Sequence, residues 1–249
     1  MIKRKNEPGC FGRRLVGLDP IVLGCLTGAV STKQARRVAK LPGFGGFEAR
    51  YDLFDKVAKF EKILGDKKLA DSAILFTDRS TKEGGKTDPG DVKGRARVIR
   101  RYLPYVNGVD IELSSPEVIA RVVQVIKEAR KMLVISYHNF KRTPSLRQLN
   151  KICRQAVALG ADVVKVATMI READFPRADE DCRVLTIFMA THLGLVQKAV
   201  IGMGKAGGPT RVFFPYLGSV LVYASVGPPT AEGQFSVEEM LDIFAKIKR

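Results

Sequence analysis

Residues 108–138 read GVDIELSSPEVIARVVQVIKEARKMLVISYH, and this stretch indicates the fold class. It begins with a short apolar run, GVDIEL, and ends with another, MLVISYH. Between them, apolar residues recur at steps of three and four, as in an amphipathic helix, and Ser115 stands at the expected N-cap. Strands that alternate with helices form parallel sheets through crossover connections. The stretch therefore predicts one strand-helix-strand unit of an α/β protein.

Six further apolar or alternating runs repeat this pattern outward from that unit. Helix-like segments separate the runs, such as SLRQLNKICRQAVALG, where Ser145 is the expected N-cap and Gly160 the expected end. Gly194 marks a similar end. The six runs are IVLGCLT (21–27), GFEARYDLF (46–54), SAILFTD (72–78), DVVKVAT (162–168), KAVIGMG (198–204) and SVLVYAS (219–225). Eight such units predict a (β/α)8 TIM barrel, with a doubly wound parallel sheet as the alternative.

The length agrees with a single barrel. The chain has 249 residues, and single barrels commonly have about 250. Because no linker divides the chain, we expect one catalytic barrel domain over residues 20–249. Residues 1–19 contain the only dense basic piece, MIKRKNEPGCFGRR. Its charge, Gly and Pro predict a mobile amino-terminal arm.

Composition limits the classes of function. No apolar run approaches the roughly 20 residues of a membrane span, so we expect a cytoplasmic protein. Four cysteines, Cys10, Cys25, Cys153 and Cys182, lie far apart, which predicts reduced thiols and no zinc site. The net charge of +16 suits nucleic acid, a membrane surface or an anionic small molecule.

Lys165 interrupts the apolar run 162–168 and needs an explanation, because lysine is rarely buried unless something pairs it. Its ammonium group could reach solvent or pair with a carboxylate. Alternatively, a low-dielectric interior favours the neutral amine, which is nucleophilic and can form a Schiff base with a ketone or aldehyde. Both interpretations are open on the residues alone.

The two histidines differ in their surroundings. His138 ends the run 132–138, where a hydrogen-bonded core histidine is one interpretation. The carboxyl end of a barrel strand, however, is where catalytic groups lie, and this favours a role in chemistry. His192 lies near the end of a helical segment, and we interpret it as structural.

Charged residues lie within one of the early runs and just after another. Glu48 and Arg50 are two positions apart, so they share one face of a strand. They could hold one ligand together or form a surface pair. Arg79 and Glu83 lie in the loop after residues 72–78, which two glycines allow to turn tightly.

Further polar residues lie within or after the later runs. Asp110 and Glu112 alternate inside a strand, where carboxylates without partners would be costly. Arg211 follows the glycines of 204–208, at a place where barrels often hold an anion. Thr230 and Gln234 lie in a loop rich in Pro and Gly that we interpret as a lid. The glycines of GMGKAGG (202–208) have the wrong placement for a dinucleotide-binding motif.

Three of these segments in order resemble the signature of the type I 3-dehydroquinate dehydratase family. They are DIEL (110–113), VISYHN (134–139) and ADVVKVA (161–167). Supporting pieces occur in the same order: LTG (26–28), EARYD (48–52), FTDRSTKEGGK (76–86), MGKAGGPTR (203–211), GS (218–219) and EGQFS (232–236). The resemblance covers roughly residues 20–248 and leaves out the basic arm.

The resemblance implies roles for individual residues. Lys165 is similar to the lysine that forms a Schiff base with the ketone of 3-dehydroquinate. His138 is similar to the general acid and base of a syn elimination of water that gives 3-dehydroshikimate, with Glu83 as its carboxylate partner. The implied substrate-binding residues are Glu48, Arg50 and Arg79 for hydroxyl groups, Arg211 for the carboxylate, Gln234 and Thr230 in the closing loop, and Cys25. Asp110 and Glu112 are expected only to support the site.

Family membership would also imply the pathway, the cofactor requirement and the oligomeric state. It implies the third step of the shikimate pathway, which leads to aromatic amino acids, no metal or organic cofactor, and a homodimer. The sequence departs from the resemblance at Cys25 and Thr230, where serines are expected. A thiol is a weak hydrogen-bond donor, so we expect an altered substrate affinity and an intact reaction.

Two other functions compete with this one. A class I aldolase-type enzyme would share the Schiff-base lysine and break or form a carbon-carbon bond instead. A basic barrel that binds nucleic acid would fit the net charge, but the chain has no Trp and little aromatic interleaving for stacking. We therefore expect a small-molecule substrate, with neither nucleic acid nor a membrane as partner.

Overall fold

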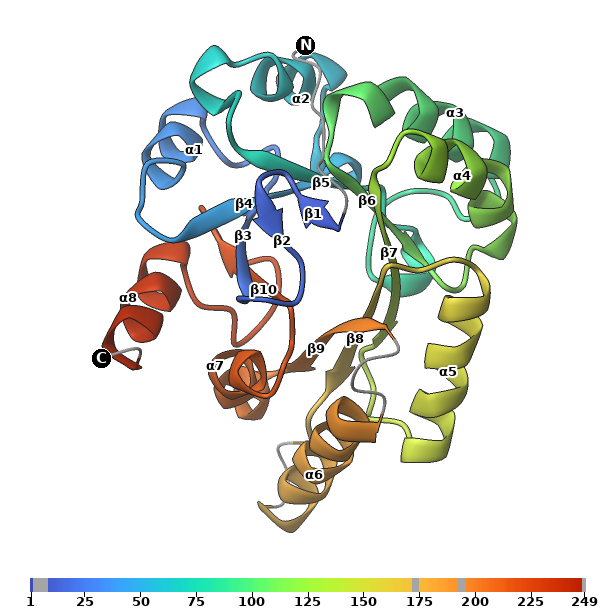
Figure 1. Ribbon diagram of the computed structural model, residues 1–249, viewed down its shortest axis with the longest axis vertical. Coiled ribbons are helices and arrows are strands. Elements are labelled where there is room, and N and C mark those ends of the chain that lie inside the picture. Colours follow the sequence, from blue (N-terminus) through green and yellow to red (C-terminus); the bar gives the residue numbers. More distant parts are fainter. Residues whose placement is uncertain (2–8, 172–174, 192–195, 248–249) are drawn as a thin grey trace.

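The computed structural model describes residues 1, 9–171, 175–191 and 196–247. Strands and helices alternate after a short hairpin (Figure 1). The strands are β1 (Cys10–Phe11), β2 (Arg14–Leu15), β3 (Ile21–Leu26), β4 (Phe44–Arg50), β5 (Ala73–Thr77), β6 (Gly108–Glu112), β7 (Met132–Asn139), β8 (Val163–Met169), β9 (Gln197–Met203) and β10 (Leu221–Ser225). The α-helices are α1 (Thr32–Val38), α2 (Val57–Leu64), α3 (Val92–Tyr102), α4 (Pro116–Glu128), α5 (Leu146–Ala158), α6 (Phe175–Thr191), α7 (Gly208–Tyr216) and α8 (Val237–Ile247).

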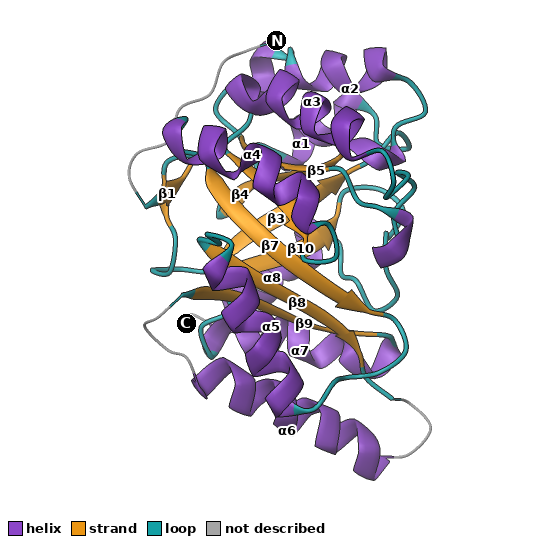
Figure 2. Ribbon diagram, turned by 90° about the vertical axis from the view of Figure 1, so that its right-hand side faces the viewer, coloured by secondary structure: helices purple, strands orange, loops and turns teal. Residues whose placement is uncertain are grey.

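The eight strands β3 to β10 form one parallel sheet that curls into a barrel. Their order is β10-β3-β4-β5-β6-β7-β8-β9, so neighbours in sequence are neighbours in space. A bridge between Lys198 and Ser219, with a 2.8 Å bond from the Val220 amide to the Lys198 carbonyl, joins β9 to the start of β10. Figure 2 shows the helices outside the strands. The predicted (β/α)8 barrel is confirmed, and the doubly wound alternative is wrong.

Side-chain alternation along each strand separates an inner from an outer core. In β8, Val164 and Val166 pack outward against the helices, whereas Val163 and Ala167 belong to the inner cluster. Because strand side chains alternate between two faces, Lys165 must point into the barrel with that inner pair. The period of two therefore places a lysine where an apolar core would otherwise continue.

The hairpin of β1 and β2 lies at the amino-terminal end of the barrel. Phe11 has no exposed surface and belongs to the inner cluster. Gly12 turns the chain with φ of +64°, and a Cβ there would come 2.8 Å from the Cβ of Ala73. Residues 10–15 therefore form a hairpin that the buried Phe11 ties to the barrel, and the mobile arm over residues 1–19 stays a prediction. Residues 2–8 lie outside the described residues.

The helix boundaries expected from capping residues agree with the structure. Ser145 precedes α5 and forms a complete capping box with Gln148. Ser115 precedes α4, but its side chain makes no capping hydrogen bond. Gly160, with φ of +90°, follows the end of α5. His192 and Gly194 lie outside the described residues. Among the residues that the structure describes, no helix is long and apolar enough to cross a membrane.

Candidate active site

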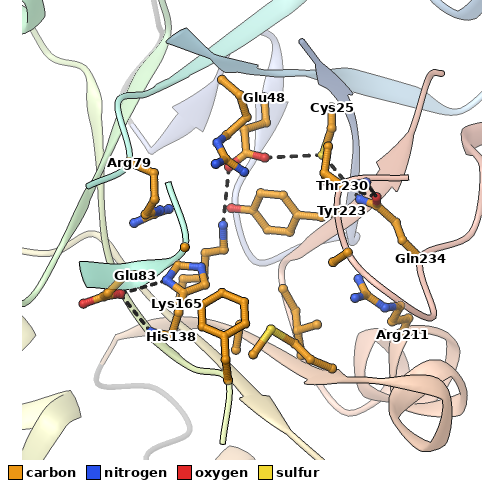
Figure 3. A pocket seen from close by; sticks show the side chains of 17 residues that line it. Cys25, Glu48, Arg79, Glu83, His138, Lys165, Arg211, Tyr223, Thr230 and Gln234 are labelled. Carbon is orange, nitrogen blue, oxygen red and sulfur yellow. Dashed lines mark hydrogen bonds and ion pairs between the residues drawn. The ribbon is translucent and has the colours of Figure 1, made fainter. Parts of the chain in front are cut away.

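A cavity of about 600 Å³, counted with its open mouth, lies at the carboxyl ends of the strands. All ten residues proposed from the sequence line it: Cys25, Glu48, Arg50, Arg79, Glu83, His138, Lys165, Arg211, Thr230 and Gln234. Figure 3 shows the side chains that it labels converging from opposite sides of the barrel. Parallel strands that close on themselves bring their carboxyl ends to one rim, so residues distant in sequence meet there.

Lys165 is buried within this cavity, with 4% of its surface exposed. Its Nζ lies 3.2 Å from Oδ2 of Asp110 and 3.4 Å from Oε1 of Glu48. The same nitrogen lies 3.8 Å from the centre of the Tyr223 ring. The lysine thus has two carboxylates and an aromatic face around its ammonium group.

The two carboxylates near Lys165 are held ionised by their surroundings. Burial opposes ionisation of Glu48, but the charges of Lys165 and Arg50 outweigh it and lower the pKa of Glu48. Burial likewise opposes ionisation of Asp110, but Arg79 and Lys165 bring the pKa of Asp110 below its usual range. Asp110 therefore contacts the lysine directly, whereas the sequence predicted only a supporting role.

His138 and Glu83 form a second polar pair at the rim. Nδ1 of His138 and its backbone nitrogen both lie 2.9 Å from Oε2 of Glu83. Burial raises the pKa of Glu83 to about 7, against the opposing charge of Arg79. Burial, Arg79 and Lys165 together lower the pKa of His138 well below its usual value, so the imidazole is neutral at pH 7. An ionised Glu83 can only accept, which puts the imidazole proton on Nδ1 and leaves Nε2 free.

Arg79 and Arg50 each have fixed partners. Arg79 donates to Asp110 Oδ2 at 2.9 Å and to Ser136 Oγ at 2.5 Å. Arg50 makes two bonds to the Asp52 carboxylate, at 2.9 and 2.8 Å. Asp52 lies in a 3-10 turn after β4, in a stretch that the sequence analysis had counted as strand. These bonds hold both guanidinium groups at the cavity wall.

Arg211, at the start of α7, is a buried cation without a carboxylate partner among the described residues. It is 5% exposed, and its Nε has no hydrogen-bond partner there. Burial lowers the pKa of Arg211 to about 10, so it is still charged at neutral pH. A buried charge without a partner is costly. An anion that enters the cavity would supply the missing partner.

The loop after β10 closes the opposite side of the cavity. Oε1 of Gln234 accepts hydrogen bonds from the Thr230 backbone at 2.8 Å and hydroxyl at 3.1 Å, and its Nε2 lies 3.4 Å from Cys25 Sγ. The Cys25 thiol donates to Glu48 Oε2 at 3.3 Å. Burial and the Glu48 charge raise the pKa of Cys25 to about 12, so this thiol stays protonated. Polar contacts thus run from Gln234 in the loop through Cys25 on β3 to Glu48 on β4.

Some cavity residues had no signal in the sequence. They are Gly84, Phe140, Ala167, Ile201, Met203, Tyr223 and Ala231. Ala167, Ile201 and Met203 are apolar residues in apolar runs, where nothing separates a cavity wall from a core position, and Gly84, Phe140 and Ala231 lie in loops. Tyr223 in SVLVYAS is different, because alternation would have placed it on the same face as Leu221 and Ser225.

Comparison with known proteins gives one consistent result. Residues 25–249 match the model of the family described as Type I 3-dehydroquinase. A 3-dehydroquinate dehydratase of Thermodesulfovibrio yellowstonii is 33% identical over 206 residues, which cover 82% of this chain and 86% of that protein. One of Methanosarcina barkeri is 32% identical over 223 residues, covering 86% and 89%. The crystal structure of 3-dehydroquinate dehydratase from Geobacillus kaustophilus superposes with a TM-score of 0.81 at 26% identity, covering 94% and 93%.

Proposed function

Because the chain belongs to the type I 3-dehydroquinase family and is therefore a hydro-lyase, we propose that it converts 3-dehydroquinate to 3-dehydroshikimate through a Schiff base on Lys165. The reaction would be a syn elimination of water and the third step of the shikimate pathway. The observation that carries the proposal is the cavity itself, which joins a buried lysine, a neutral histidine and an arginine without a carboxylate partner.

The amine of Lys165 is the nucleophile that converts the ketone into an electron-accepting imine. Its neutral form attacks the ring ketone, the ketone oxygen then leaves as water, and the protonated imine that results accepts electrons when the neighbouring carbon loses a proton. Asp110 and Glu48, both ionised, lie on either side of this nitrogen and would stabilise the iminium charge. The two carboxylates therefore favour the cationic intermediate over the neutral ketone.

The imidazole of His138 acts as the base. Its neutral form, with the proton on Nδ1 toward Glu83, leaves Nε2 to take a proton from the carbon beside the imine. The same nitrogen then returns a proton to the departing hydroxyl group, which leaves as water. One group serving both steps requires that proton and hydroxyl leave from the same face, which is a syn elimination.

Recognition of the substrate carboxylate falls to Arg211. A guanidinium group binds a carboxylate with two parallel hydrogen bonds. Gln234 and Thr230 lie in the loop that would close over the bound ring. Arg50, Arg79 and Glu48 line the opposite wall, where donors and an acceptor suit the ring hydroxyl groups.

Borohydride trapping tests the proposal. The protein is reduced with and without 3-dehydroquinate, and its peptides are mapped by mass spectrometry. An adduct of ligand mass on Lys165, together with the absorbance of the conjugated product, supports the dehydratase. A folded protein that binds the compound without forming an adduct would overturn it.

A matched variant and a second readout make the test specific. Lys165→Met keeps the length of the side chain without the amine, so it should bind the compound and give neither adduct nor product. An adduct without the conjugated product would instead favour an aldolase-type reaction. We also propose, from the family resemblance alone, a cytoplasmic homodimer, for which sedimentation velocity would measure the mass.

A further inference from the structure

Tyr223 is a polar residue of the cavity that the steps above leave unused. It comes from β10, on the far side of the barrel from His138, and is 5% exposed. Its ring packs against the Lys165 amine, with 3.8 Å between Nζ and the ring centre. In Figure 3 its hydroxyl end points toward Lys165 and Glu48. The Tyr223 side chain is therefore in direct contact with the amine that acts as the nucleophile.

The hydroxyl of Tyr223 has no hydrogen-bond partner among the described residues. Buried tyrosine hydroxyls usually find a partner, because an unmade hydrogen bond inside a protein destabilises the fold. Phenylalanine would fill the same space without that cost. An unused donor that lines a cavity indicates that a ligand completes it.

The surroundings of this hydroxyl decide which role it can take. Burial, Asp110 and Glu48 raise the pKa of Tyr223 well above its usual value. The phenol is therefore protonated at any working pH and can donate a hydrogen bond, but it cannot act as a base. A group that gains negative charge near Lys165 during the reaction is the partner that such a donor would stabilise most.

We propose that the Tyr223 hydroxyl donates a hydrogen bond to the ketone oxygen while Lys165 attacks the ketone carbon. In that step the nitrogen-carbon bond forms, and the π pair of the carbon-oxygen bond moves onto oxygen. The proton lost from nitrogen ends on that oxygen, which gives the carbinolamine. The phenol keeps its own proton throughout. Because the oxygen is two bonds from Nζ, it lies within reach of a hydroxyl whose ring contacts Nζ.

The proposal rests on the Schiff-base function above and is tested by Tyr223→Phe. The protein in excess is mixed with 3-dehydroquinate, and borohydride is added after short delays. The rate of adduct formation on Lys165 is measured as the protein concentration is raised. Because borohydride reduces the imine, the plateau of this rate reports addition to the ketone and the loss of water that follows, and its half-saturation reports binding. We expect the plateau to fall about tenfold or more, as for loss of an oxyanion donor, with half-saturation within about twofold.

Controls separate this role from packing. Tyr216→Phe makes the same chemical change at an exposed tyrosine of α7 and should leave both quantities unchanged. The melting temperature of Tyr223→Phe should be equal to or above that of the unsubstituted protein, because the lost hydroxyl had no partner. An unchanged plateau, or a loss confined to half-saturation, would overturn this inference alone. No adduct in the unsubstituted protein would overturn the Schiff-base function as well.

Discussion

Glu83 and His138 form a pair whose pKa values move in opposite directions. Burial raises the pKa of Glu83 to about 7, and burial with two nearby cations lowers that of His138. In the proposed mechanism the active form has an ionised Glu83 and a neutral imidazole. As pH falls through about 7, Glu83 takes up a proton and no longer holds the required tautomer. Activity should therefore decline below neutral pH.

Glu83→Gln tests this assignment through the pH dependence of kcat/KM. The amide removes the ionisation, so the acid limb should move to lower pH, toward the titration of His138. The plateau should be about 10- to 100-fold lower, because the general base is less well oriented. An acid limb that stays near pH 7 in the variant would assign that titration to another group. Glu117→Gln, in the first turn of α4 away from the cavity, should leave the profile unchanged.

Ser115 and Ser145 are both N-cap residues, but their hydroxyl groups bind different partners. The Ser145 hydroxyl caps α5. The Ser115 hydroxyl instead accepts from Arg95 Nη1 and donates to Glu112 Oε1, both at 2.7 Å. Glu112 Oε2 lies 3.5 Å from Arg79 Nη1, so this buried network extends to the cavity wall. The start of α4 is thus connected by hydrogen bonds and ion pairs to the cavity wall, whereas the serine at the start of α5 only caps its own helix.

Alanine at each of the two serines separates stability from function. Ser145→Ala should lower the free energy of unfolding by about 1 kcal/mol and leave kcat unchanged. Ser115→Ala leaves two buried groups short of a partner, so it should cost about 1–3 kcal/mol and also lower kcat severalfold. Urea unfolding and steady-state kinetics measure both quantities. Equal kinetics in the two variants would contradict a link from α4 to the site.

The loop after β10 is the element that covers the cavity. Gln234 connects this loop to β3 through Cys25, and its hydrogen bond with Thr230 holds the conformation of the loop. Gln234→Ala should weaken substrate binding by about tenfold, since it removes both the closing contact and a ligand donor. The rate of Schiff-base formation at saturation should fall much less, because Lys165 is held by other elements. Equal losses in binding and in trapping rate would refute the closing role.

At the scale of the whole molecule, the net charge of +16 favours the approach of anions to the protein. Salt screens such attraction, since the Debye length falls from about 30 Å at 0.01 M to about 10 Å at 0.1 M. We expect kcat/KM for the monoanionic substrate to fall about two- to fivefold over this range, with kcat unchanged. The measurement is repeated with a second monovalent salt to exclude specific chloride binding. A constant kcat/KM would mean that the charge serves another purpose.

Local pattern was enough to predict most of the fold. The eight runs and their helices follow from periods of 2 and of three to four residues, and the alternation in ADVVKVA alone puts Lys165 on the face of Val163. The ten proposed site residues came from polar positions at strand ends and from the family resemblance, and all line one cavity. The alternation and the strand ends depend on neighbours within a few residues, which a linear sequence displays directly, whereas Cys25 was named only through the resemblance.

Other features depended on closure of the barrel. Asp110 contacts Lys165 across 55 residues of chain, and Tyr223 packs against it from the last strand. The hydroxyl of Ser115 has partners that a capping pattern cannot reveal. Phe11 is buried because the barrel offers it an open end, although its own segment reads as a basic tail. Local sequence determined which face each side chain takes, whereas only the closed sheet determined which side chains meet, because those distances are set by strands far apart in the chain.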